Sequence, residues 1–538
     1  MSAEPARRSR RAMRVTAAHD RSRALAVILG VAALLAVGMV ADLLAAPEPP
    51  PPPEALEQAA ATAGSWYCPA VANEGENAVV DIAAVGGDAS QVVVDRFGED
   101  GVTADDPITV EPGQTHRLTL DGASATAPVA VRWAGGPTAV TWRVDGQRSA
   151  AAPCEPAPAE HWYVNGFTTM LGSQSRLHLF NPYTTDAVVR LIFSDPDGAD
   201  RLLLADNLLV GAGGTTTVNL NRFKPQIADL GVMVEVLAGR VVAQGELRTD
   251  PPGDTAGPSG RLLLPAASQP AMSWAFAWSA HAEGSESWLS VMNPGDQAAA
   301  VEVRVTEPRE DGGELVGEIS IPAGAVARIE LANVSARPTF GVTVNVVNDQ
   351  PVVASRSVSW TERGQRVVIG SLGAVQPSRR IAVVGTRGRT RTATLVVFNP
   401  GPNEAFVDVT APGAPDDWAG IELAPNTRRA LPLDELDSDD VVAPVIVTAD
   451  EPVVAEARSL AAGERLLMYL MAGVAQERWI GPLTRPPVRR DPALSTRAIR
   501  PTPAAVEDLL PQLDEPLPGE EEELPPDPAD DETEPPDG

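Results

Sequence analysis

The sequence predicts an all-β protein in which four tandem antiparallel β-sandwich modules follow one transmembrane helix, with disordered tails at both ends. A marker series recurs four times, and its opening residue stands at Asn73, Asn181, Asn293 and Asn399. Alternating apolar and polar residues follow each marker, a pattern typical of half-buried strands. One long apolar stretch lies near the N-terminus. These observations define the fold class.

The apolar stretch covers residues 24–46 and is interrupted only by Asp42. As a helix it would be about 35 Å long, slightly more than the ~30 Å hydrocarbon core of a bilayer. Seven arginines precede it, within residues 1–23, and a Pro-rich acidic segment follows. This asymmetry predicts a cytoplasmic N-terminus and export of the bulk of the chain. The alternative, a cleaved secretory signal, requires a small residue where Leu44 stands.

The charge distribution limits the partners. The net charge is -30, and residues 506–538 hold 14 carboxylates and no Arg or Lys, so the rest of the chain carries -30 + 14 = -16. Such a surface repels phosphate backbones, and we expect no nucleic-acid partner. We expect residues 47–63 to form an extended Pro-rich stalk and residues 484–538 to be a disordered, Pro-rich acidic tail. Of the 42 basic residues only Lys224 is lysine, which is typical of GC-rich genomes.

The two cysteines, Cys68 and Cys154, fall at the two ends of the first module, 86 residues apart. In an oxidising compartment they predict a disulfide, which would stabilise the fold by up to about 4 kcal/mol in the chain-entropy model. A reactive or metal-binding thiol is the alternative. Neither cysteine has a neighbouring His or a C-x-x-C motif, so we favour the disulfide.

The steps between the marker asparagines are 108, 112 and 106 residues, which is one small domain per copy. Each copy holds three landmarks, N-P-(G/Y), a turn such as P-A-G, and P-V-V-A, separated by alternating strands. About seven short strands in roughly 100 residues favour a two-sheet sandwich. The expected modules are residues 64–156, 157–265, 266–375 and 376–483.

These landmarks resemble the immunoglobulin-like or fibronectin-like repeats of bacterial surface proteins. The layout, with W-Y-C-P at Trp66 to Pro69 opening the first module, is similar to a family of actinobacterial envelope proteins of unknown function. The resemblance covers about residues 24–480 and implies a fold and a location, but no catalytic residues. The first copy departs from the pattern, since Asn73 is followed by Glu74 instead of Pro.

Aromatic residues supply the one candidate ligand site. The spacing of Trp274, Phe276 and Trp278 predicts three rings on one face of a strand, where they would form a sugar-stacking platform. The alternative, which we favour, is packing in the sandwich interior, where large rings usually lie. We expect the Asn of each Asn-Pro pair to cap its own turn. Acidic clusters at residues 195–200 and 434–440 leave calcium binding open, since neither has EF-hand spacing.

The sequence contains no G-x-S-x-G elbow, P-loop or H-E-x-x-H pattern, so we expect no catalytic, cofactor or metal site. We expect a non-catalytic envelope protein that acts as a scaffold or interaction array, its partners being envelope proteins or cell-wall glycan. One alternative is a carbohydrate-binding or adhesion array. Another is a cell-wall glycan hydrolase, which would need two carboxylates facing each other across a cleft.

Overall fold

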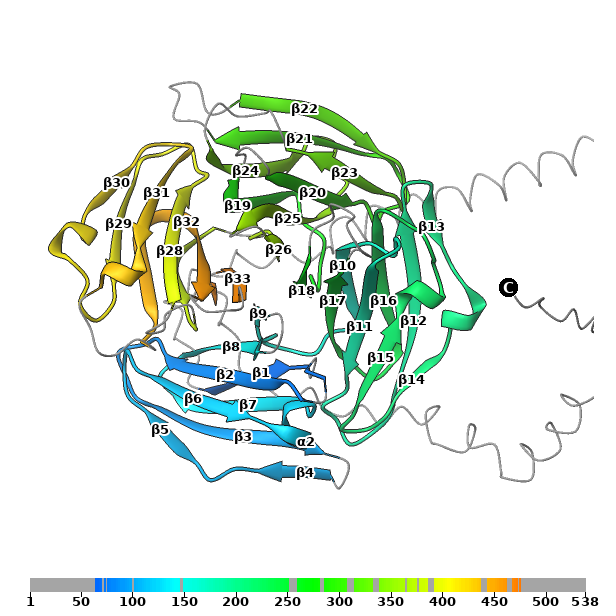
Figure 1. The fold of residues 1–538 in the computed structure, drawn as a ribbon, viewed down its shortest axis with the longest axis horizontal. Helices are drawn as coiled ribbons and strands as arrows, with labels where there is room; N and C mark the ends of the chain where they lie inside the picture. The colour runs from blue at the N-terminus through cyan, green and yellow to red at the C-terminus, as the bar shows by residue number, and fades with distance from the viewer. Residues whose placement is uncertain are drawn as a thin grey trace, which may run out of the picture. The chain divides into compact units, whose positions relative to one another are not determined.

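The computed structural model describes residues 63–475 and shows β-sheets in which all strand pairs but one are antiparallel, within the described ranges (Figure 1). Short internal stretches fall outside the description, namely 70–71, 74, 99–100, 146–148, 251–258, 281–284, 307–313, 332–337, 363–364, 375–376, 386–390, 437–442, 462–466 and 473. The all-β prediction is confirmed: within the described ranges the helical elements are one four-residue helix and four three-residue 3₁₀ turns.

Strands from each sequence copy form two sheets, and we call the sheet that contains the last strand of the copy the inner sheet. In the first copy the outer sheet holds β1 (Ala63–Cys68), β7 (Val129–Gly135), β3 (Ser90–Gly98), β4 (Gly101–Ala104) and β5 (Ile108–Val110). The inner sheet holds β6 (Thr115–Leu120), β2 (Asn77–Ala84), β8 (Thr138–Asp145) and β9 (Ala150–Pro153), and α2 (Gly122–Ala125) lies between β6 and β7 in the chain.

The second copy repeats this order. Its outer sheet holds β10 (His161–Phe167), β16 (Leu230–Ala238), β12 (Ala187–Asp195), β13 (Gly198–Asp200) and β14 (Leu208–Val210). Its inner sheet holds β15 (Thr215–Asn219), β11 (Ser173–Phe180), β17 (Val242–Thr249) and β18 (Ser259–Pro265). Two 3₁₀ turns, η1 (Leu203–Ala205) and η2 (Leu220–Arg222), lie before β14 and after β15.

In the third copy the outer sheet holds β19 (Ser273–Ala280), β24 (Thr339–Val346), β21 (Ala299–Thr306) and β22 (Glu314–Ile321). The inner strands are β23 (Val326–Glu330), β20 (Glu286–Met292), β25 (Val353–Glu362) and β26 (Gln365–Leu372). Strand β26 pairs in parallel with β18, Ser259 opposite Val367 and Gly260 opposite Val368. The inner sheets of the second and third copies are therefore one eight-stranded sheet.

In the fourth copy a single bent strand serves both sheets. The strands are β27 (Ser378–Val383), β28 (Arg391–Asn399), β29 (Ala405–Thr410), β30 (Ile421–Leu423), β31 (Thr427–Pro432), β32 (Val445–Ala461), β33 (Leu467–Ala472) and β34 (Val474–Ala475), with 3₁₀ turns η3 (Asp416–Trp418) and η4 (Leu433–Glu435). The first half of β32 pairs with β27 and β29, and its second half pairs with β28 and β33.

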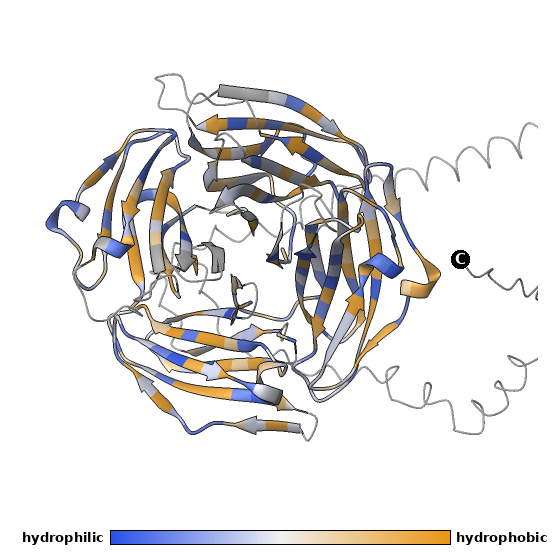
Figure 2. Cartoon of the chain, in the orientation of Figure 1, coloured by the Kyte–Doolittle hydropathy of each residue, from blue (hydrophilic) through white to orange (hydrophobic). Residues whose placement is uncertain are grey.

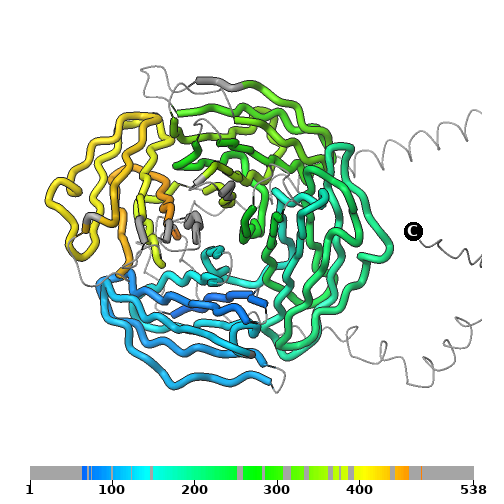
Figure 3. Tube along the Cα trace, in the orientation of Figure 1, coloured from blue at the N-terminus to red at the C-terminus, as the bar shows by residue number. Residues whose placement is uncertain are grey.

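Apolar side chains on alternate strand positions fill the space between each pair of sheets, an alternation visible in Figure 2. Among the described residues four large hydrophobic clusters result, which we call the first, second, third and fourth cores. Figure 3 shows the four copies as successive stretches of the chain, and a few side chains from other copies join these clusters, such as Leu263 in the first core. They are centred on Val80 and Trp66, on Leu191 and Trp162, on Val303 and Trp274, and on Val407 and Leu395.

The cores contact one another in the order of the chain, and the fourth also contacts the first. Smaller clusters join the first and second cores through Phe97 and Phe180, the third and fourth through Trp278 and Phe398, and the fourth and first through Val384. Strands β9, β18 and β26, the last of the first three copies, and β33 of the fourth copy lie next to one another in succession (Figure 1). The repeats are thus packed together along their inner sheets.

Several predictions from the sequence fall on other parts of the chain. No helix within the described ranges is long and apolar enough to cross a membrane. The expected anchor at 24–46, the stalk, the cytoplasmic tail and the C-terminal tail lie outside the described residues. The module boundaries and the count of four modules stay predictions.

Candidate functional site: buried polar contacts between the cores

Polar side chains lie on the outward face of the strand that carries the P-V-V-A landmark. In β17, Ala243 and Leu247 point into the second core, whereas Val242, Gln244 and Glu246 point away from it. All five are buried. Ala243 and Leu247 are buried by the second core, and the three outward-facing side chains are buried because the first copy covers them. Buried polar groups must find partners, so this face is where specific contacts between cores are expected.

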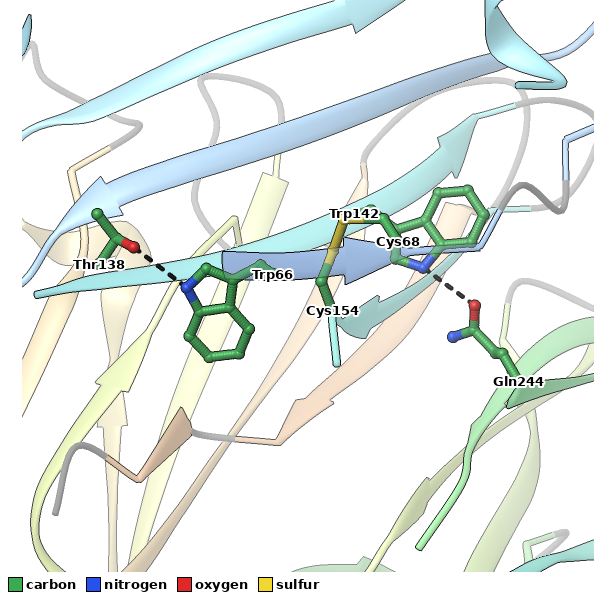
Figure 4. Close-up of a disulfide and its surroundings, with 6 residues drawn as sticks. All are labelled: Trp66, Cys68, Thr138, Trp142, Cys154 and Gln244. Carbon is green, nitrogen blue, oxygen red and sulfur yellow. Dashed lines mark hydrogen bonds between the residues drawn. A yellow bond between two sulfur atoms is a disulfide. The ribbon is translucent and has the colours of Figure 1, made fainter. Parts of the chain in front are cut away.

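The contact of the first and second cores has an apolar part and a polar part. Phe97 and Phe180 meet edge to face with ring centroids 4.9 Å apart. The indole Nε1 of Trp142 donates a hydrogen bond of 3.2 Å to Oε1 of Gln244 (Figure 4). Since Trp142 belongs to the first copy and Gln244 to the second, this bond fixes the position of one copy against the other.

A cluster of charges extends the same contact. Glu246, fully buried, accepts hydrogen bonds of 2.7 Å from both Arg248 and Arg261. Arg261 reaches across to Glu76 of the first core at 2.9 Å. Burial alone raises the pKa of Glu246, but the hydrogen bond with His178 and the charges of the two arginines outweigh it and lower the pKa to about 2. Glu246 is therefore an anion held between guanidinium groups.

Asn73 lies in the turn before β2, whereas Asn181, Asn293 and Asn399 stand at the ends of the corresponding strands β11, β20 and β28, so the expected alignment of Asn73 with them is wrong. Its backbone N–H and its carboxamide Nδ2 both donate to Glu76, at 2.8 and 3.0 Å, and its Oδ1 accepts a 3.1 Å bond from Arg176 of the second core. In the other copies the marker asparagine accepts a hydrogen bond within its own turn. The first copy uses this turn to bind its neighbour.

His178 lies beside Glu246 and is 3% exposed. Its Nε2 is 3.3 Å from Oε2 of Glu246, and its Nδ1 is 3.0 Å from Oγ1 of Thr217. Burial lowers the pKa of His178 below 6.5 although Glu246 opposes this, and the charges of Arg176 and Arg261 add to the lowering. We assign a neutral ring that donates from Nε2 to Glu246 and accepts at Nδ1 from the Thr217 hydroxyl.

The second and third cores share one carboxamide in addition to the parallel strand pair. Asn165, 1% exposed, donates from Nδ2 to the carbonyl oxygens of Ser290 at 2.8 Å and Val353 at 3.0 Å. The same two copies are also joined by an ion pair, with Arg328 Nη1 3.5 Å from Asp229 Oδ1.

The third and fourth cores are joined by a buried ion pair. Arg356 and Glu456, 1% and 2% exposed, meet through two hydrogen bonds of 3.2 and 3.1 Å. Glu456 also accepts from Ser371 Oγ at 3.2 Å and from the backbone N–H of Trp278 at 2.9 Å. Burial lowers the pKa of Arg356, while Glu456 opposes this. Four donors thus compensate the buried carboxylate.

The fourth core meets the first at Asp81 and Val85. Arg117 forms a two-pronged pair with Asp81, at 2.6 and 3.0 Å. Gly385 of the fourth copy has a φ of 78°, and a Cβ there would lie 2.9 Å from Oδ2 of Asp81. Arg380 also donates to the carbonyl oxygen of Val85 at 2.6 Å. Glycine is needed at 385 for both its backbone conformation and this close approach.

The predicted disulfide is confirmed. Cys68 at the end of β1 and Cys154 after β9 form a bond of 2.02 Å that ties the outer sheet of the first copy to its last inner strand (Figure 4). Beside it, Trp66 donates from Nε1 to Oγ1 of Thr138 at 3.1 Å. The bond therefore closes the first core.

The three rings of the candidate platform are buried: Trp274 and Phe276 are 0% exposed and Trp278 is 5% exposed. Trp274 and Phe276 lie in the third core, whereas Trp278 lies between the third and fourth cores. The shared face expected from their spacing is wrong, because the register of β19 shifts between Phe276 and Ser279. Such a bulge turns the following side chain to the other face. Stacking on a sugar needs exposed rings, so these residues act in packing.

The Asn-Pro residues act in their own turns. Asn293 accepts at Oδ1 from the N–H of Gly295 and donates from Nδ2 to the carbonyl oxygens of Gln297, Ile321 and Pro322. Asn181 and Asn399 make the corresponding bonds. Each side chain joins the turn to the strand across the sandwich.

The acidic loop at 195–200 already holds a cation of the protein. The ammonium of Lys224 lies 3.1 Å from Asp195 and 2.8 Å from Asp200. Across the described part of the chain, no group of three or more His, Cys, Asp or Glu side chains is arranged to hold a metal ion. The loop at 434–440 lies partly outside the description.

An exposed leucine patch lies on the second copy: Leu203 and Leu204 of η1 are 86% and 84% exposed, and Leu209 of β14 is 58% exposed. The fourth copy has the same backbone there, since η3 and β30 also begin five residues apart. The third residue of each 3₁₀ turn is buried in its core, and the pattern in both short strands is half-buried, exposed, buried.

At the three matching exposed positions the fourth copy has acidic residues, Asp416, Asp417 and Glu422. The fold therefore accepts charged side chains at these positions. The leucines of the second copy are exposed, and exposed apolar clusters commonly mark interaction sites. Neither this patch nor the charge cluster was predicted from the sequence. The patch could have been found by aligning residues 202–210, L-L-L-A-D-N-L-L-V, with residues 416–423, D-D-W-A-G-I-E-L, since leucines in the first segment match acidic residues in the second.

The fold and these contacts define a class of all-β protein in which tandem sheet pairs are joined by buried polar contacts. The chain belongs to a family of unknown function, DUF5719, whose model matches residues 122–414, more than half of the chain. This match confirms the expectation that the chain belongs to a family of unknown function. No curated protein matches the chain. A crystal structure of Thermotoga maritima 1070 matches with 18% identity over 20% of this chain and 95% of that chain, with a TM-score of 0.18.

Proposed function

We propose that the protein is a non-catalytic scaffold of the cell envelope, anchored by residues 24–46, that binds a partner protein through the leucine patch of the second copy. The proposal includes four immunoglobulin-like sandwich modules on the outer side of the membrane. The basic N-terminus, the disulfide and the acidic composition support this location.

The comparison of the second and fourth copies carries the proposal. One backbone conformation presents leucines at 203, 204 and 209 in one copy and acidic residues in the other. Burying one leucine side chain contributes about 1.5–3 kcal/mol, so three of them can supply much of the free energy of a specific contact. The charged residues around the patch, such as Arg201 and Asp206, would form its polar rim.

Three buried carboxylates are engaged in ion pairs. Glu246, Glu456 and Asp81 are each held by arginines. The cationic partners of Glu246 help to lower its pKa to about 2, whereas burial raises the pKa of Glu155 to about 8. The three rings proposed for the carbohydrate-binding alternative, Trp274, Phe276 and Trp278, are buried.

A photo-crosslinking experiment in cells that make the protein natively tests the partner site. A photoreactive amino acid is placed at Leu204 of the full-length chain, and at Asp417 as the matched control. We expect one recurrent protein adduct of constant mass from position 204 and none from position 417. The adduct should disappear in the variant L203D/L209E, which copies the fourth copy.

Equal adducts from both positions, or an adduct that survives L203D/L209E, would show that the leucines do not select a partner. Location is tested separately with a reporter that is active only outside the cytoplasm, fused after Gly538. An inactive reporter would exclude the envelope location and leave the crosslinking result standing.

A further inference from the structure

His178 lies inside the contact between the first and second cores, which we call the first joint. It shares one face of β11 with Arg176 and Phe180, two residues before and two after it. Arg176 bonds to Asn73, and Phe180 packs edge to face against Phe97, both in the first copy. The ring between them is therefore covered by the same contact.

The charges around His178 come from every element that packs on it. They are Arg176 on β11, Glu246 and Arg248 on β17, Arg261 on β18 and Glu76 in the turn before β2, while β15 contributes only the Thr217 hydroxyl. Among the residues that the structure describes, three guanidinium groups and two carboxylates surround the ring. A proton on His178 would add a positive charge beside the guanidinium groups, in a buried place where an uncompensated charge is costly.

We propose that the first joint is pH-sensitive and loosens when His178 takes up a proton. Opening the joint hydrates the imidazolium and the surrounding guanidinium groups, so protonation and opening favour each other. Because the pKa of His178 is lower in the closed joint than its ordinary value of 6.5, the open state binds more protons. The closed joint is fully stable above pH 6.5 and is progressively weakened as the pH falls below it.

The other joints provide a comparison within the same molecule. The second and third cores are joined through Asn165, and the third and fourth through Arg356 and Glu456. Among the histidines that the structure describes, His178 is buried and His116 and His161 are exposed. Mild acid should therefore act on the first joint and leave the joint at Arg356 unchanged.

Amide hydrogen exchange of the full-length protein, compared at pH 7.5 and pH 5.0 after correction for intrinsic rates, tests the proposal. We expect faster exchange at pH 5.0 in β11, β17 and residues 76–84, with no change in β25. The variant H178Q, which cannot take up a proton, should lose this increase. The matched control H116Q, an exposed histidine of the first copy, should retain it.

An acid-induced increase that persists in H178Q, or one of equal size in β25, would overturn the proposal. If H178Q does not fold, T217V provides the second test. It removes the hydroxyl that supports the neutral ring, so the pH midpoint of loosening should move upward. An unmoved midpoint in folded T217V would likewise contradict a role for His178.

Discussion

Replacing Glu456 by Gln should open the contact between the third and fourth cores. The substitution keeps the shape of the side chain but removes the charge that compensates Arg356, which is fully buried and held by two hydrogen bonds of 3.1 and 3.2 Å. The bonds from Ser371 and the N–H of Trp278 lose the strength that an anionic acceptor gives them. Arg356 cannot lose its proton at accessible pH, so the buried charge stays.

Removing one partner of a buried ion pair costs about 3–5 kcal/mol. Since about 1.4 kcal/mol is a factor of ten in an equilibrium constant, the local opening equilibrium should rise about 10²- to 10⁴-fold. Amide hydrogen exchange of β25 and of the second half of β32 measures this opening directly. The double variant R356M/E456M, which removes both charges, should recover most of the loss.

A matched control lies on the same strand. Glu451 pairs with Arg379 at 3.7 Å, and their side chains are 34% and 56% exposed. Exposed pairs contribute about 0–1 kcal/mol, so E451Q should change exchange in β32 by less than about tenfold. If E456Q and E451Q behave alike, the buried pair does not hold the two cores together and the reasoning fails.

Three further predictions concern single sites. The variant C68S/C154S should lose about 2–5 kcal/mol of unfolding free energy in the first core alone, measured by urea-dependent exchange; an effect spread equally over all cores would contradict it. The variant N293A should lower the free energy of unfolding by about 1–3 kcal/mol, because the buried carbonyl groups that accept from Asn293 would lose their hydrogen-bond donor. The variant N348A, at an exposed asparagine of the same copy, should lower it less in the same assay. Glu246 has a pKa of about 2 in the folded protein against an ordinary value of 4.5. Its ionised form therefore stabilises the folded state fully above pH 4.5, and this contribution of about 3 kcal/mol is lost as the pH falls towards 2. An acid-unfolding profile of E246Q that matches the wild type would refute this.

The sheets and turns could be predicted because their determinants are local. The alternation Val301, Val303 and Val305 sets one buried face of β21, and the Asn-Pro turn at Asn293 follows from side-chain hydrogen bonds within a few residues. The disulfide followed from two cysteines and an expected oxidising compartment. These inferences need no knowledge of distant parts of the chain.

The arrangement of the cores could not be predicted because it depends on pairings far apart in the sequence. Gly260 meets Val368 across more than one hundred residues, and a Cβ on Gly260 would lie 2.5 Å from the valine side chain. In the sequence this glycine looks like part of a breaker-rich linker. Only the folded chain shows that it allows two strands to approach.

The polar contacts between cores were missed for a related reason. Gln244, Glu246 and Glu456 occupy alternate positions of half-buried strands, where polar residues are normally read as solvent-facing. A second protein surface covers them here. Trp278 was placed on the wrong face because a bulge between Phe276 and Ser279 leaves no clear mark in residue types.

The parallel pairing of β18 with β26 has a consequence for how such a chain can change over evolutionary time. Tandem copies in many surface proteins are gained and lost by recombination, because each copy folds as an independent bead. Here, excision of the third copy would leave the edge at Ser259 and Gly260 without its hydrogen-bonding neighbour and uncover Leu262. The number of copies is therefore held by the structure itself, and divergence should proceed by substitution within copies, as the leucines at 203 and 204 and the aspartates at 416 and 417 illustrate.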